Sequence, residues 1–104
     1  MGRKQQNGKA EAARVRLELD APAAREVFVA GTFNAWKPNT TRMARDGGGR
    51  WVADLAVPAG RHEYKFVVDG RWCCEVGPDG PTERAADGVP NDQGTMNLVL
   101  KAAP

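Results

Sequence analysis

The sequence lacks the features that mark membrane proteins and nucleic-acid-binding proteins. Its 104 residues contain no long apolar run, so neither a signal peptide nor a transmembrane segment is predicted, and we expect a cytoplasmic protein with no membrane partner. The lysines and arginines are scattered and the net charge is only +2, so no nucleic-acid partner is predicted. A chain of this length has room for one domain.

Histidine and cysteine are also scarce. The chain has one histidine, His62, and two cysteines, Cys73 and Cys74, which are adjacent. Neighbouring cysteines form only a strained disulfide, and in a strand their side chains point to opposite faces. We therefore expect two reduced thiols, one inward and one outward, with no metal site and no other cofactor.

No segment has the spacing of an amphipathic helix, whereas several segments alternate polar and apolar residues with the period of two that is typical of strands. Many short strands joined by turns predict an all-β antiparallel sandwich or barrel. The expected strands are 14–19, 26–31, 51–57, 61–68, 71–76 and 96–101, with a short edge strand near Met43 and a tight turn at Asp69-Gly70.

Two segments are not expected to form regular structure. Residues 1–12 are polar and predict a disordered N-terminal arm, which leaves 13–104 as the folded domain. Residues 77–94 are rich in glycine, proline and aspartate and predict a long loop. Its acidic residues are expected to be solvated, because a mobile loop cannot hold two carboxylates at a fixed glycosidase separation. They are Asp79, Glu83, Asp87 and Asp92.

Alternation divides the larger side chains between core and surface. Trp51 begins a strand whose same-face neighbours are apolar, so it is predicted to lie in the core, as are Tyr64 and Phe66. Lys65 lies between the last two and is predicted to point outward into solvent. His62 is interpreted as a strand histidine with satisfied hydrogen bonds.

Three segments resemble the family-48 carbohydrate-binding modules: 27–36 (VFVAGTFNAW), 60–72 (GRHEYKFVVDGRW) and 94–100 (GTMNLVL). That family includes the glycogen-binding domain of the AMP-activated protein kinase β subunit and the N-terminal modules of branching and debranching enzymes. The resemblance implies an immunoglobulin-like sandwich that binds an α-glucan such as glycogen or starch and is not an enzyme.

The same resemblance implies that Trp36, Lys65, Trp72 and Asn97 contact the sugar, with Thr95 as a further candidate. A glucose ring has two apolar C–H faces and a rim of hydroxyls, so an indole can cover a face while an ammonium or amide bonds to the rim. The alternatives are that a tryptophan packs in the core, that Lys65 is an ordinary surface lysine, and that Asn97 only bridges the last strand.

The chain departs from the family in two places. After Trp72 the family has an Asp-Pro-Asn type of turn, which is absent here, and Gln93 stands where the kinase domain has an apolar tip. Some members of the family do not bind sugar. The alternative function is therefore a protein-docking or regulatory module of the same fold that contacts a kinase or a glycogen-processing enzyme.

Overall fold

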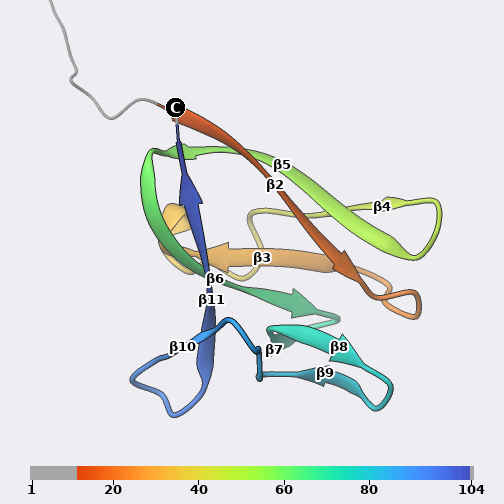
Figure 1. Cartoon of the computed structure of the whole chain (residues 1–104). Coiled ribbons are helices and arrows are strands. Elements are labelled where there is room, and N and C mark those ends of the chain that lie inside the picture. The colour runs from red at the N-terminus through yellow and green to blue at the C-terminus, as the bar shows by residue number, and fades with distance from the viewer. Residues whose placement is uncertain (1–11, 104) are drawn as a thin grey trace, which may run out of the picture.

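The alternating segments form antiparallel strands in the computed structural model, which describes residues 12–103 (Figure 1). One short 3-10 turn, η1, interrupts them. The elements are β2 (Ala12–Asp20), β3 (Val27–Gly31), η1 (Thr32–Asn34), β4 (Ala44–Asp46), β5 (Arg50–Pro58), β6 (Gly60–Val68), β7 (Arg71–Cys73), β8 (Glu75–Gly77), β9 (Gly80–Thr82), β10 (Val89–Pro90) and β11 (Met96–Ala102).

The strands form two main sheets and a small hairpin. One sheet has the order β2-β5-β4. The other has the order β10-β11-β6-β3, and β7 also pairs with β6. Strands β8 and β9 pair with each other beside the second sheet (Figure 1). The all-β antiparallel sandwich that the sequence predicts is confirmed.

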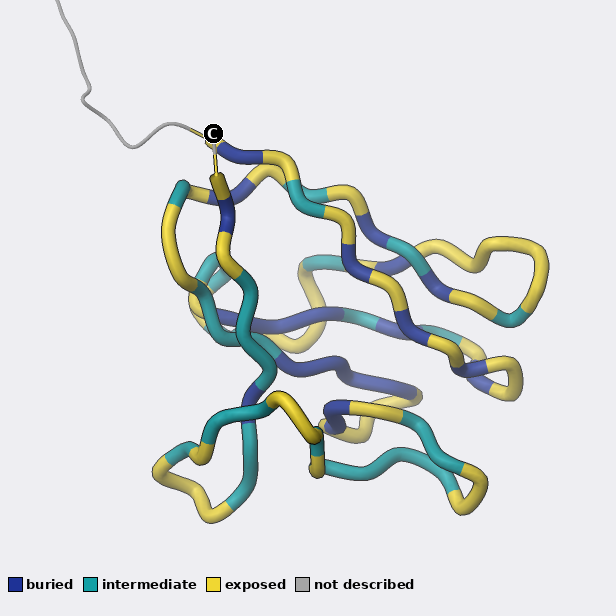
Figure 2. Tube along the Cα trace, viewed as in Figure 1, coloured by how far each residue is buried: buried dark blue, intermediate teal, exposed yellow. Residues whose placement is uncertain are grey.

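The core lies between the two main sheets, where the buried segments of both face each other (Figure 2). Leu17 and Leu19 of β2, Trp51 of β5, and Phe66 and Val68 of β6 are each no more than 7% exposed. Complete burial of a side chain of this kind contributes about 1.5–3 kcal/mol. The predicted core positions of Trp51 and Phe66 are confirmed, and Tyr64 packs against the same cluster while half-buried.

His62 has both ring nitrogens satisfied, as predicted. Its Nε2 lies 2.7 Å from the carbonyl oxygen of Pro58, and its Nδ1 lies 2.8 Å from the hydroxyl of Thr32. Because a carbonyl can only accept, Nε2 carries the proton and Nδ1 accepts from the hydroxyl. The Phe33 ring meets the imidazole edge-on, with 5.9 Å between centroids.

The turn between β6 and β7 is the predicted Asp69-Gly70 hairpin. Both residues have positive φ, 48° and 85°, the conformation that a two-residue type I′ turn requires. The Asp69 carboxylate also accepts the backbone N–H groups of Arg25 and Glu26, both at 2.9 Å. This hairpin is therefore fixed to the segment that enters β3.

The structure corrects two sequence-based expectations. Residues 77–94 are not entirely irregular, because β8 pairs with β9 and β10 pairs with β11. Pro81 and Pro90 interrupt the alternation that would have revealed these short strands. Cys73 and Cys74 do not lie one inside and one outside, because β7 ends at Cys73 and alternation no longer applies. Both thiols are buried, and burial raises the pKa of Cys73 to about 11.

The predicted N-terminal arm lies outside the described residues except for Ala12, which is the first residue of β2. Among residues 12–103 there is no helix of the length and apolar character needed to cross a membrane.

Candidate functional site

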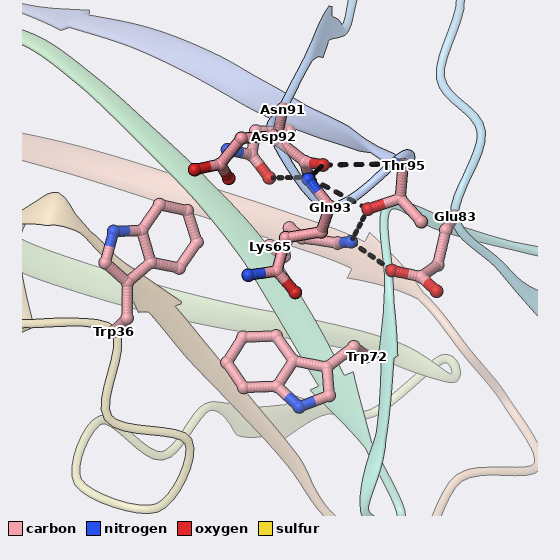
Figure 3. A pocket seen from close by; sticks show the side chains of 9 residues that line it. Trp36, Lys65, Trp72, Glu83, Asn91, Asp92, Gln93 and Thr95 are labelled. Carbon is pink, nitrogen blue, oxygen red and sulfur yellow. Dashed lines mark hydrogen bonds and ion pairs between the residues drawn. The ribbon is translucent and has the colours of Figure 1, made fainter.

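A cavity of about 640 Å³ lies on the outer face of the five-stranded sheet (Figure 3). This volume is within the range of small-molecule binding sites. All five residues that the sequence analysis nominates line it. The full lining is Trp36, Lys65, Trp72, Glu83, Asn91, Asp92, Gln93, Thr95 and Asn97.

Strand alternation explains why Lys65 and Trp72 share this outer face. Phe66 belongs to the core cluster, so its neighbours Lys65 and Val67 point to the other side of β6. Val67 pairs with Trp72 across the β6–β7 ladder, and residues directly opposite each other lie on one face of a sheet.

The cavity lies where β6 changes its partner strand. Tyr64 is the last residue of β6 that pairs with β11, and Phe66 is the first that pairs with β7. The two partner strands therefore separate beside Lys65. On β11, Leu98 packs against the core, so alternation turns Asn97 toward the cavity.

Trp36 reaches the cavity from the loop after η1. Ala35 and Trp36 both have left-handed backbone, with φ of 58° and 61°, which L side chains rarely adopt. The Asn34 side chain supports this conformation: its Oδ1 accepts the N–H of Gly31 at 2.9 Å. Its Nδ2 donates to the carbonyl of Val29 at 3.0 Å and to the hydroxyl of Thr41 at 2.9 Å. The loop is thus held at both of its ends by one amide.

The two indoles lie on the same side of the domain and border one space (Figure 3). Trp72 is 38% exposed and is the only exposed large apolar side chain among residues 12–103. Trp36 is half-buried. The alternative that either ring packs in the core does not hold, because neither residue belongs to a core cluster.

The structure corrects the expectation that Lys65 extends into solvent. The side chain lies on the predicted face, but it is only 6% exposed. Its Nζ donates to the Glu83 carboxylate and, at 3.1 Å, to the hydroxyl of Thr95. The expectation that Glu83 is merely solvated is also wrong. An ammonium has three protons, so one remains for a ligand.

Asn97 is likewise engaged within the protein. Its Nδ2 donates to Glu63 at 2.9 Å, and its Oδ1 accepts from Asn91 at 2.9 Å. The hydrogen bond from Asn97, followed by that from Arg61, lowers the pKa of Glu63 below its ordinary value. The bridging role that the sequence analysis left open for Asn97 is the one that the structure describes.

Asn91, which the sequence analysis did not single out, organises the loop above the cavity. Its Oδ1 accepts the backbone N–H groups of Gln93 at 2.9 Å and Thr95 at 3.0 Å. Its Nδ2 donates to the Thr95 hydroxyl at 2.8 Å. A signal was available, because an asparagine in a segment rich in turn residues often accepts the backbone N–H two residues further on and so closes a turn.

The cavity therefore combines two flat apolar surfaces with amide, hydroxyl and carboxylate groups around them. This combination suits a polar ligand that has flat C–H faces. Within residues 12–103, no cluster of three or more His, Cys, Asp or Glu side chains could hold a metal ion.

An open, aromatic-lined cavity on the outer face of a small β-sandwich fits a carbohydrate-binding module. This chain belongs to the family described as the glycogen recognition site of AMP-activated protein kinase, which it matches over residues 15–100. The family membership predicted from the sequence is confirmed.

Curated relatives agree with this membership. Over 76 residues the chain is 42% identical to subunit beta-2 of 5'-AMP-activated protein kinase from Homo sapiens, covering 73% of this chain and 24% of the relative. Over 77 residues it is 32% identical to subunit beta-1 from Sus scrofa, covering 74% of this chain and 54% of the relative. The chain thus spans between a quarter and about half of these relatives.

Proposed function

We propose that this domain binds α-1,4-linked glucan of the glycogen or starch type, without catalysis, by stacking glucose rings on Trp36 and Trp72. The observation that carries the proposal is the convergence of two solvent-accessible indoles on one cavity. Membership of a family described by glycogen recognition supports it.

The chemistry of the lining suits a glucan. Each indole can cover the C–H face of one glucose, and a curved chain can present successive rings to two separate plates. The rim of hydroxyls would meet the amide of Gln93, the carboxylates of Glu83 and Asp92, and the remaining proton of Lys65. Asn97 and Thr95 would act mainly by holding this lining in place, since their polar atoms bond to neighbours.

The expected affinity is low. Each hydroxyl exchanges a bond with water for a bond with protein, for a net gain of about 0.5–1.5 kcal/mol. Two stacked rings and a few such bonds, less the cost of association, correspond to a Kd of about micromolar to millimolar. A polymer that offers many equivalent sites would raise the apparent affinity.

Isothermal titration with maltoheptaose and β-cyclodextrin tests the proposal. Cellohexaose is the matched control, because it has the same sugar units in a β-1,4-linked, extended chain. We expect heat from the two α-glucans and none from cellohexaose. No binding of α-glucan at millimolar concentration would overturn the proposal, and release of reducing sugar by the pure protein would overturn its non-catalytic part.

A second candidate function is a docking or regulatory module that contacts a kinase or a glycogen-processing enzyme. It is favoured by the names of the relatives, which are kinase subunits of which this chain spans only a part. A binding assay with the purified catalytic subunit of such a kinase decides it. Binding of the catalytic subunit that persists in Trp36→Ala/Trp72→Ala protein would support docking. If the unmodified protein does not bind the catalytic subunit, the docking function is rejected and the glucan remains as the proposed ligand.

A further inference from the structure

The charges in the lining of the cavity are unevenly divided. Of the nine lining residues, Lys65 alone is basic, whereas Glu83 and Asp92 are acidic. The lining therefore has a formal charge of −1 at neutral pH, although the whole chain has a net charge of +2. The local charge and the overall charge have opposite signs.

The single cation is poorly placed to meet an anionic ligand. Two of its three protons are used by Glu83 and Thr95, and its side chain is 6% exposed. The carboxylates are more accessible, since the Glu83 side chain is 40% exposed and Asp92 is exposed. Figure 3 shows Asp92 at the rim near Trp36 and Glu83 at the opposite side, beyond Lys65.

We propose that Glu83 and Asp92 make this cavity select uncharged glucans over glucans that carry phosphate. The proposal rests on the proposed function. A neutral sugar hydroxyl can donate to either carboxylate in a charge-assisted hydrogen bond. A phosphate brings about −1.5 to −2 charges toward both carboxylates and finds no unpaired cation in the lining.

The size of the effect follows from Coulomb's law. At about 7 Å in water, one unit charge beside one carboxylate changes a binding constant by roughly threefold. The lining has a net charge of −1, so a phosphate of about −1.5 to −2 charges at this distance should be disfavoured by about fivefold. At physiological ionic strength the Debye length is about 8 Å, so charges well beyond this distance from the phosphate contribute little. The overall charge of the chain, taken alone, would predict the opposite preference.

The test compares two ligands of equal length: maltotetraose, and maltotetraose phosphorylated at C6 of an internal glucose. A short chain keeps the phosphate close to the indoles. The Kd values of both are measured by tryptophan fluorescence in about 150 mM salt, and the ratio of phosphorylated to neutral Kd is compared among variants. The variants are Glu83→Gln, Asp92→Asn, Lys65→Met/Glu83→Gln, and Asp54→Asn as a control of equal charge change on the other sheet.

We expect a ratio of about five in the unmodified protein, a ratio near one in each single lining variant, whose lining is neutral, and no change in Asp54→Asn. The Lys65→Met/Glu83→Gln protein keeps the lining charge at −1, so its ratio should stay near that of the unmodified protein even if Glu83→Gln alone folds poorly. Equal affinity for the two ligands, or an equal fall in the control, would overturn the inference while leaving glucan binding intact. Failure to bind neutral maltotetraose even at high millimolar concentration would overturn the proposed function and this inference with it.

Discussion

Trp51 and Trp72 lie on strands of the same sandwich, yet one belongs to the interior and the other to the cavity. Trp51 is 4% exposed, its indole N–H donates to the carbonyl of Ala21 at 2.9 Å, and Arg45 covers its ring at 4.8 Å from the centroid. Trp72 is 38% exposed and borders the cavity together with Trp36. The indole N–H and the ring of Trp51 both have partners within the protein, whereas the ring of Trp72 is partly exposed to solvent.

The difference follows from the face of the strand on which each residue falls. Trp51 shares its face with Ala53 and Val57, which are buried. Trp72 pairs with Val67 on the outer face, where the partner strands of β6 separate. Register thus places Trp51 in the core and Trp72 beside the cavity, and the core role of the one and the proposed binding role of the other predict opposite responses to mutation.

The largest effect is expected for Trp51→Ala, because it leaves a cavity in the core and removes the hydrogen bond from the indole to the carbonyl of Ala21. The free energy of unfolding should fall by about 3–5 kcal/mol. Denaturant unfolding followed by far-UV circular dichroism measures it. A loss below 1 kcal/mol would contradict the core role of Trp51.

Trp72→Ala should weaken sugar binding and leave stability nearly unchanged, the opposite of Trp51→Ala. We expect the affinity for maltoheptaose to fall about tenfold or more, which corresponds to about 1.4 kcal/mol or more of binding free energy. The free energy of unfolding should change by less than about 1 kcal/mol, because the ring is partly exposed. Trp36→Ala should behave in the same way, and calorimetric titration of folded variants measures both. Unchanged affinity in either variant would remove that ring from the site.

Glu83→Gln should cost about 1–3 kcal/mol of stability, because it leaves the buried Lys65 ammonium without a carboxylate. The expected loss of stability is smaller than for a fully buried ion pair, because the Glu83 side chain is 40% exposed and water screens its charge. Lys65→Met/Glu83→Gln should recover most of the loss, since it removes the charge as well. A double-mutant cycle by thermal unfolding checks this, and purely additive effects would show that the ion pair contributes nothing.

Asn34→Ala should weaken glucan binding by several-fold and stability by about 1–2 kcal/mol, because three hydrogen bonds that support the Trp36 loop are lost. Asn39→Ala is the matched control, as Asn39 is exposed in the same loop. Both are measured by calorimetric titration and thermal unfolding. Equal effects of the two substitutions would argue against a specific role for Asn34.

The smallest effect concerns pH. The folded-state pKa of Glu63 is lowered, so its ionised form contributes stability above the unfolded-state pKa of about 4.3, and the contribution is lost as pH falls through the lower folded value. The stability difference between the unmodified protein and Glu63→Gln should therefore shrink from pH 7 to pH 3. A difference that stays constant over this range would contradict the hydrogen-bonding role of Glu63.

Alternation alone predicted most of the fold, because one face of nearly every strand is apolar. It placed Trp51 and Phe66 in the core, and the Asp-Gly dipeptide, which is typical of a two-residue hairpin turn, located the turn at Asp69-Gly70. It missed the β8–β9 hairpin, where Pro81 and flanking glycines replace the alternating pattern.

Five of the nine residues that line the candidate site were predicted, and their contacts were not. All five nominated residues line the cavity, but the family resemblance, not periodicity, selected them. Alternation predicts the face of the sheet on which Lys65 lies, but it does not predict which segments pack on that face. The burial of Lys65 and its pairing with Glu83 therefore could not be predicted. Contacts between segments distant in sequence, such as that of Asn91 with Asn97, have no local signature.

The central claim is that Trp36 and Trp72 bind the sugar while Trp51 does not. The three tryptophans give three indole N–H resonances in a ¹H–¹⁵N spectrum, assigned by single Trp→Phe variants. On addition of maltoheptaose, the resonances of Trp36 and Trp72 should shift together along one binding curve, and that of Trp51 should stay in place. A spectrum in which neither cavity indole moves, or in which Trp51 moves as far as they do, would contradict the account.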